Sequence, residues 1–124
     1  MTRKKVFISF DFDRDKVLKD LLIGQSRNKE CPFTVTDNSL IEAAPEKDWE
    51  KKAKARIDKA DLVIVMLGEK TDKAPGVLKE VKIARELGKR TIQLIGHKDG
   101  KYARVPKAGI LYRWTWDNLK KLLC

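Results

Sequence analysis

The stretch DLVIVMLGEKTDKAPGVLKEVKIARELG, residues 61–88, decides the fold. It opens with a run of apolar residues, 62–67, several of which are β-branched. An apolar run without alternation is typical of a strand that is covered on both faces. Gly68 ends the run, a polar loop follows, and Pro75 stands where a first helical residue is expected. The stretch therefore predicts a buried strand, a short loop and a helix.

The predicted helix, 77–87, contains one residue whose position needs an explanation. At about 100° per residue, Glu80 falls inside the apolar stripe of this helix, which consists of Val77, Val81, Ala84 and Leu87. Two explanations are open. The carboxylate bends out into solvent or pairs with a lysine, or it lines a pocket where desolvation raises its pKa and function uses it.

Further strands and helices are predicted on both sides of this stretch. Strands are expected at 5–10, 33–36, 91–95 and 110–112. A first helix, capped by Asp13, carries on one face Val17, Leu18, Leu21 and Leu22. A second helix spans 46–59. A last helix, capped by Thr115, carries Leu119, Leu122 and Leu123.

Strands that alternate with helices predict an α/β fold with a parallel sheet covered on both faces. At this length the commonest solution is a flavodoxin-like three-layer sandwich, with a parallel five-stranded sheet in the order 2-1-3-4-5. Ligands of such sheets bind beyond the carboxyl ends of the strands, at the switch between strands 1 and 3. The start of the Glu80 helix should therefore share one crevice with Phe10, Asp11, Asp37, Ser39 and Gly68.

Length and composition indicate a single domain, 1–124, that is long enough to bury a core. No apolar run approaches the roughly 18 residues of a membrane span, and two cysteines in unrelated contexts favour a reducing cytoplasm. The net charge of +10 is compatible with a nucleic-acid partner. However, the lysines are spread over every predicted helix, often beside acids, and no recognition motif accompanies them. We therefore expect a solvated basic surface, with no specific nucleic-acid partner and no membrane contact.

The most conspicuous acidic motif is DFDRD, residues 11–15. It does not fit a calcium loop, because Lys16 and Leu22 stand where Gly and Glu are required. Its aspartate spacing is that of a magnesium-dependent phosphatase of the haloacid-dehalogenase type, although Asp15 stands where Thr or Val is usual. No Gly-rich phosphate-binding loop is present. The phosphatase stays open as a minor alternative, and the favoured interpretation contains no metal site.

Several segments together carry a family resemblance. They are KVFISFDFD at 5–13, DLVIVMLGEKT at 61–71, VLKEV at 77–81 with Ala84, and YRWTWDNL at 112–119. In these segments the chain resembles the bacterial and archaeal TIR-like domains, among them the TIR-like signalling subunit of Thoeris antiphage systems. The resemblance spans nearly the whole chain. It implies a flavodoxin-like fold, in agreement with the pattern of strands and helices.

The resemblance also implies that NAD is used as a substrate, with no further cofactor. Catalytic TIR domains cleave the bond between nicotinamide and ribose with a glutamate on the helix after the third strand, which is the position of Glu80. Thoeris subunits of this kind make a cyclic ADP-ribose isomer that activates a partner effector. By this resemblance Phe10 and Asp11 would form a wall and a polar edge for the ribose or the base, and Asp37 and Ser39 would add contacts.

One departure from the family pattern leaves a second interpretation open. Family members commonly carry a tryptophan just before the valine of this helix, whereas here Pro75 and Gly76 precede Val77. The alternative is a noncatalytic module that self-assembles or binds a phage or host component. The favoured prediction is a cytoplasmic NAD glycohydrolase or ADP-ribosyl cyclase of antiphage defence, whose diffusible nucleotide signal reaches an effector protein.

Overall fold

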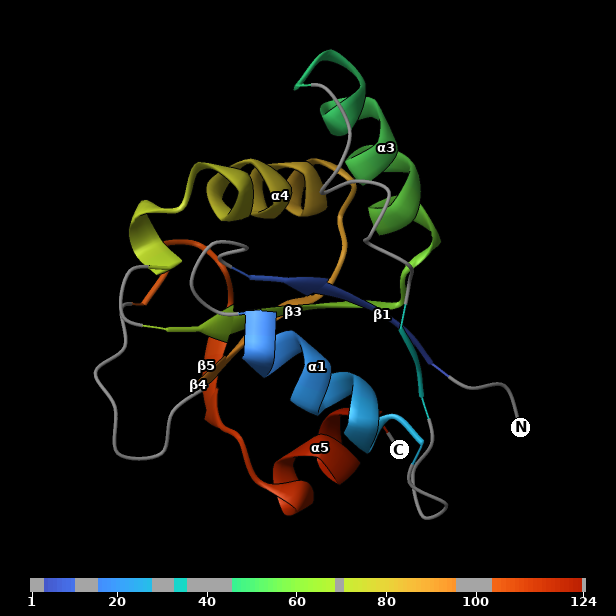
Figure 1. The fold of residues 1–124 in the computed structure, drawn as a ribbon, viewed down its shortest axis with the longest axis vertical. Helices are drawn as coiled ribbons and strands as arrows, with labels where there is room; N and C mark the ends of the chain where they lie inside the picture. The colour runs from blue at the N-terminus through green and yellow to red at the C-terminus, as the bar shows by residue number, and fades with distance from the viewer. Residues whose placement is uncertain are drawn as a thin grey trace.

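The computed structural model describes residues 4–10, 16–27, 33–35, 46–68, 71–95 and 104–123. Its strands are β1 (Lys5–Ser9), β2 (Thr34–Val35), β3 (Leu62–Leu67), β4 (Thr91–Ile95) and β5 (Ile110–Arg113). Its helices are α1 (Lys16–Gln25), α3 (Glu46–Lys59), α4 (Pro75–Glu86) and α5 (Trp116–Leu123), with a short 3₁₀ turn, η1 (Thr71–Lys73), before α4. Figure 1 shows these strands as a central sheet with helices above and below it.

The five strands form one parallel sheet in the order β2-β1-β3-β4-β5. This confirms the predicted α/β class and the predicted strand order. The central strand β3 is buried along its whole length, as its unbroken apolar sequence requires. In the register of β1 and β3, Ser9 pairs with Val65, so β3 continues for two residues, Met66 and Leu67, past the end of β1.

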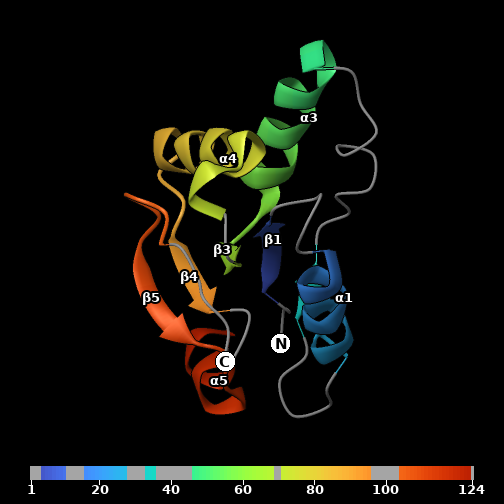
Figure 2. The same cartoon turned by 60° about the vertical axis from the view of Figure 1, so that its left-hand side comes forward.

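The two faces of the sheet are covered by different pairs of helices (Figures 1 and 2). Side chains from α1 and α5 pack on one face, against Ile8 of β1 and Ile64 of β3. Side chains from α3 and α4 pack on the other, against Phe7 and Val63. Because successive side chains of a strand point to opposite faces, odd-numbered and even-numbered residues of β1 belong to different layers.

Helix boundaries agree closely with the sequence pattern. The second predicted helix coincides with α3, and α4 begins at Pro75, which occupies the first turn as expected. The predicted face of α1 is wrong in part. Leu22 is fully buried, but Val17 and Leu21 are each 56% exposed. The apolar residues of α1 cover more than half of its circumference, but only one face of a helix can pack on the sheet. The sequence does not show which face that is.

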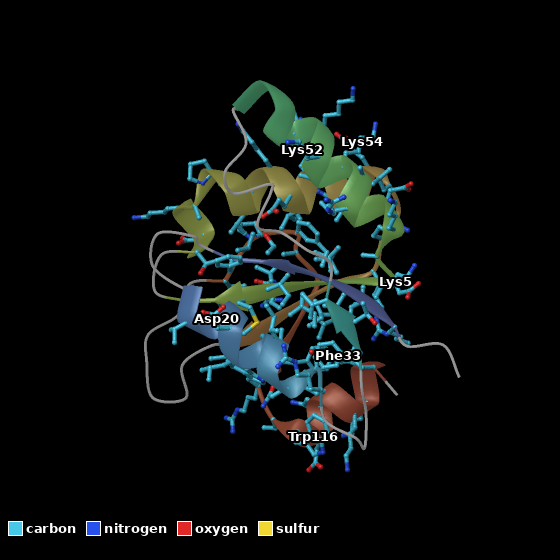
Figure 3. All side chains as sticks on the ribbon, turned by 45° about the vertical axis from the view of Figure 1, so that its right-hand side comes forward. Lys5, Asp20, Phe33, Lys52, Lys54 and Trp116 are labelled. Atoms are coloured by element: carbon cyan, nitrogen blue, oxygen red, sulfur yellow. The ribbon has the colours of Figure 1, made fainter. Side chains whose placement is uncertain are left out.

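The outer surface of α3 is basic and solvated. Lys52 and Lys54 are exposed and project away from the sheet (Figure 3). Acidic side chains of the same helix, Glu50 and Asp58, are exposed among them, as expected for a solvated helix surface. Within the described part of the chain, no helix is long and apolar enough to cross a membrane.

Candidate active site

The start of α4 is set by a short turn that follows the central strand. Gly68, the residue after β3, donates its backbone N–H to Thr71 Oγ1 at 2.6 Å. Thr71 is fully buried, although its side chain is polar. The Thr71 hydroxyl in turn lies 3.5 Å from the carbonyl oxygen of Met66. This closed turn brings the first residues of α4 back over the carboxyl end of the sheet.

Glu80 lies in the second turn of α4 and faces the sheet. It is only 8% exposed, and its stripe neighbours Val77, Val81 and Ala84 are buried as well. The prediction that helical geometry turns this acid inward is confirmed, and the alternative in which it bends out into solvent is wrong. A buried carboxylate is uncommon and requires hydrogen-bonding partners.

Ser9 supplies one of these partners. Its hydroxyl donates a hydrogen bond to Glu80 Oε1 at 2.9 Å, in a buried contact between residues that are 71 positions apart in the chain. Ser9 itself is fully buried at the end of β1. A hydroxyl that donates to a carboxylate favours the ionised form of the acid, which opposes the effect of burial.

Sequence reasoning did not select Ser9, although a signal was present. Along β1 the side chains of Val6, Ile8 and Phe10 join the core beneath α1 and α5, so Phe7 and Ser9 face the α3 and α4 layer. A serine at a position where the pattern calls for a buried apolar side chain indicates a polar partner in the covering helix. The unbroken apolar character of the rest of the strand obscured this periodicity.

The other described residues of the predicted site lie at the same edge of the sheet but have different surroundings. The Phe10 side chain, 8% exposed, belongs to the core cluster beneath α1 and α5. Glu80 lies on the opposite face, beneath α4. Gly68 is buried, and its N–H is already bonded to Thr71.

The remaining predicted contacts, Asp11, Asp37 and Ser39, lie outside the described residues. Their contribution to a nucleotide site stays a prediction. The cap predicted at Asp13 and the helix-face position predicted for Leu18 likewise fall on a residue or side chain that is not described. Within the described ranges, no cluster of three or more His, Cys, Asp or Glu side chains could hold a metal ion.

The Ser9–Glu80 pair lies at the switch point of the sheet. The chain leaves β1 for β2 on one side, whereas β3 leads to β4 on the other, and β1 and β3 are neighbours. In open parallel sheets this is the place where ligands bind, beyond the carboxyl ends of the strands. A buried carboxylate held there can stabilise a positive charge that develops on a bound ligand, or can accept hydrogen bonds from its hydroxyl groups.

Fold and site together define a small parallel α/β protein with an inward-facing glutamate on the helix after its central strand. A family model described as the TIR-like domain of Thoeris protein ThsB matches residues 7–101. The chain belongs to this family, and the resemblance found in the sequence is confirmed.

The fold is also found in a solved structure of another protein. The structure of the Clostridium botulinum CMP N-glycosidase BcmB resembles this chain with a TM-score of 0.60 and 24% sequence identity, covering 96% of this chain and 97% of that one. At this identity the likeness shows a shared fold. A comparison with curated proteins gives no match.

Proposed function

We propose that this chain is a TIR-like enzyme that cleaves the bond between nicotinamide and ribose in NAD, with Glu80 as the central carboxylate. The observation that carries the proposal is the burial of Glu80 at the switch point, where Ser9 bonds to it. Family membership supports the assignment. The related fold belongs to a CMP N-glycosidase, an enzyme named for breaking a bond between a sugar carbon and a base nitrogen.

The chemistry requires little from the protein beyond a well-placed negative charge. As the bond breaks, its electron pair leaves with nicotinamide, which becomes neutral, and the ribose acquires oxocarbenium character. A carboxylate beside the ribose stabilises this positive charge and can hold the sugar hydroxyls. Water then adds to give ADP-ribose and releases a proton, or a nucleophile within the same molecule adds to give a cyclic ADP-ribose.

We further propose that the product is a nucleotide signal of the cyclic ADP-ribose type, made in antiphage defence and sensed by a separate effector protein. Membership of the Thoeris family supports this role. Mass spectrometry distinguishes the two products, because the cyclic compound is lighter than linear ADP-ribose by one water. Phe10, Asp11, Asp37, Ser39 and Gly68 are proposed to contribute to the nucleotide site around Glu80.

The decisive experiment measures free nicotinamide after incubation of the purified protein with NAD. Glu80→Gln removes the charge while preserving the shape of the side chain, and we expect it to lower kcat by about 100-fold or more, as for removal of a key electrostatic contact. Glu86→Gln is the matched control, since Glu86 is an exposed acid on the same helix. It should retain wild-type turnover. Equal turnover by the Glu80→Gln variant would refute the assignment of this residue.

Other outcomes identify the alternatives. Absence of nicotinamide release by the wild type, even at high protein concentration, would favour a noncatalytic assembly module. Size-exclusion chromatography with and without candidate partners would then test that module. A magnesium-dependent phosphatase would hydrolyse phosphate esters, lose activity on Asp11→Asn, and be insensitive to Glu80→Gln.

A further inference from the structure

The contact between β1 and α4 contains a buried pair of polar side chains, which apolar packing between a strand and a helix does not require. Ser9 is fully buried, and its hydroxyl donates to Glu80 Oε1 at 2.9 Å. The preceding residue on the same face of the strand is Phe7, which is fully buried in the core formed with α3 and α4. An alanine or valine at position 9 would continue this apolar face without a hydroxyl to satisfy.

The backbone at Ser9 is held by the central strand. Ser9 pairs with Val65 of β3, whereas the described pairing of β1 with β2 lies at the other end of the strand, at Lys5 and Val6. The serine side chain has a single rotatable bond to its oxygen, so its hydroxyl position is well defined. Glu80, by contrast, has a long side chain whose terminal carboxylate rotation is broad unless a contact fixes it.

We propose that Ser9 is a positioning residue that holds the carboxylate of Glu80 in the orientation needed for cleavage of the N-glycosidic bond. This inference rests on the proposed function. Ser9 is not assigned a contact with the substrate. It fixes one carboxylate oxygen through a charge-assisted hydrogen bond, and thereby fixes the plane of the group that stabilises the ribose cation.

The first test compares steady-state kinetics of the wild type and Ser9→Ala with NAD as substrate. We expect kcat to fall about 10- to 100-fold, the range set by loss of a hydrogen bond to a charged group, with KM changed by less than about threefold. Ser9→Thr keeps a hydroxyl on the same carbon and should recover most of the lost kcat. Because a smaller folded fraction would also lower the apparent kcat without changing KM, kcat is expressed per folded molecule, with the folded fraction of each variant measured by circular dichroism.

Ser26→Ala is the matched control. Ser26 is also buried, and its hydroxyl also donates a hydrogen bond, in this case to the backbone carbonyl of Ile23 at the end of α1. The substitution deletes the same atom at a site on the other side of the sheet. We expect its kcat and KM to equal those of the wild type. Wild-type kcat in Ser9→Ala, or an equal loss of kcat in Ser9→Ala and Ser26→Ala, would overturn the proposal.

A second measurement tests the positioning role of Ser9 without relying on catalytic activity. Crystal structures of the wild type and Ser9→Ala should show the Glu80 carboxylate rotated or distributed over several rotamers in the variant, with the course of α4 unchanged. If the wild type does not cleave NAD, the proposed function fails and this comparison still decides the positioning role. An unchanged, ordered carboxylate in Ser9→Ala would refute it.

Discussion

Gln93 is a fully buried amide in the middle of β4, and both ends of its side chain are bonded. Its Nε2 donates to the carbonyl oxygen of Gly109 at 3.0 Å, and its Oε1 accepts from the N–H of Val105 at 2.8 Å. These contacts hold the segment 104–109 against the sheet just before β5 begins. The side chain thus bonds two backbone groups in the segment that precedes β5.

We predict that Gln93→Met lowers the free energy of unfolding by about 2–4 kcal/mol, because a buried N–H and a carbonyl oxygen lose their partner together. Urea unfolding followed by circular dichroism measures this loss. Gln25→Met provides the comparison, since Gln25 is only partly buried and accepts one hydrogen bond, from Trp114 Nε1 at 2.6 Å. That variant should lose about 1 kcal/mol. Equal losses in the two variants would contradict the special role of Gln93.

Single residues of the candidate site differ in how far the sequence alone could predict them. Glu80 was identifiable because an acid inside a helical apolar stripe violates the 3.6-residue pattern. Ser9 was not selected. A serine on the buried face of the strand indicates a polar partner, but that partner lies 71 residues away and the sequence does not identify it. Asp11, Asp37 and Ser39 were placed by strand order alone, and strand order fixes only the edge of the sheet on which a loop lies.

At the scale of elements, α5 is bonded at both of its ends. Thr115 Oγ1 accepts from the backbone N–H of Asn118 at 3.1 Å, which confirms the predicted cap. Asn118 Nδ2 reaches back to the carbonyl oxygen of Arg113 at 2.8 Å. At the other end, Lys4 Nζ donates to the carbonyl oxygen of Leu122 at 3.2 Å. A cation at the C-terminal end of a helix interacts favourably with its dipole.

We predict that Thr115→Ala lowers the free energy of unfolding by about 1 kcal/mol, the usual cost of removing an N-cap side chain. Thr115→Ser keeps the capping oxygen and should remain close to the wild type. Thermal or urea unfolding of the three proteins measures the difference. A Ser variant as unstable as the Ala variant would show that the methyl group, rather than the cap, carries the effect.

Element boundaries were more predictable than element faces. Pro75 fixed the start of α4 because its ring suits the first helical turn and lacks an N–H to satisfy. The core-facing side of α1 was not fixed in this way. Its apolar side chains surround more of the helix than one sheet can cover, and tertiary packing leaves Val17 and Leu21 largely exposed.

At the scale of the whole molecule, the backbone just before β5 lies very close to the backbone of β4. Gly109, immediately before β5, has φ of 92°, and a Cβ built there would lie 1.8 Å from the carbonyl oxygen of Thr91. The backbone of β4 therefore occupies the space that any side chain would need. Glycine at this position sets how closely the chain before β5 can approach the first residue of β4.

We predict that Gly109→Ala destabilises the protein by about 3 kcal/mol or more, from overpacking against backbone and from the left-handed conformation. Gly24→Ala is the opposite control. Gly24 is an exposed residue of α1 with nothing within 4 Å of the added Cβ, so alanine should raise the free energy of unfolding by about 0.5–1 kcal/mol. Paired urea curves measure both changes. A Gly109→Ala protein as stable as the wild type would contradict the close approach.

The overall fold was predictable because several constraints agree. Alternating strand and helix patterns require parallel pairing, right-handed crossovers restrict the topology, and an apolar run such as 62–67 must occupy the centre. Among the topologies that remain, the order β2-β1-β3-β4-β5 is the commonest at this length, and it is the order observed. The burial of Glu80 and its hydrogen bond to Ser9 could not be predicted from these constraints, because they depend on which side chains of the sheet contact those of the covering helices.

The end of β1 separates two environments. Ser9 and Phe10 are adjacent in the chain, yet one side chain joins the α4 layer and the other the α1 and α5 layer. Under the proposed function, a compact ligand beside Glu80 would stay within one of these environments, whereas an elongated ligand with a ring system at each end would reach both by lying across the strand terminus. Molecular length would then be the property by which this edge of the sheet sorts one nucleotide from another.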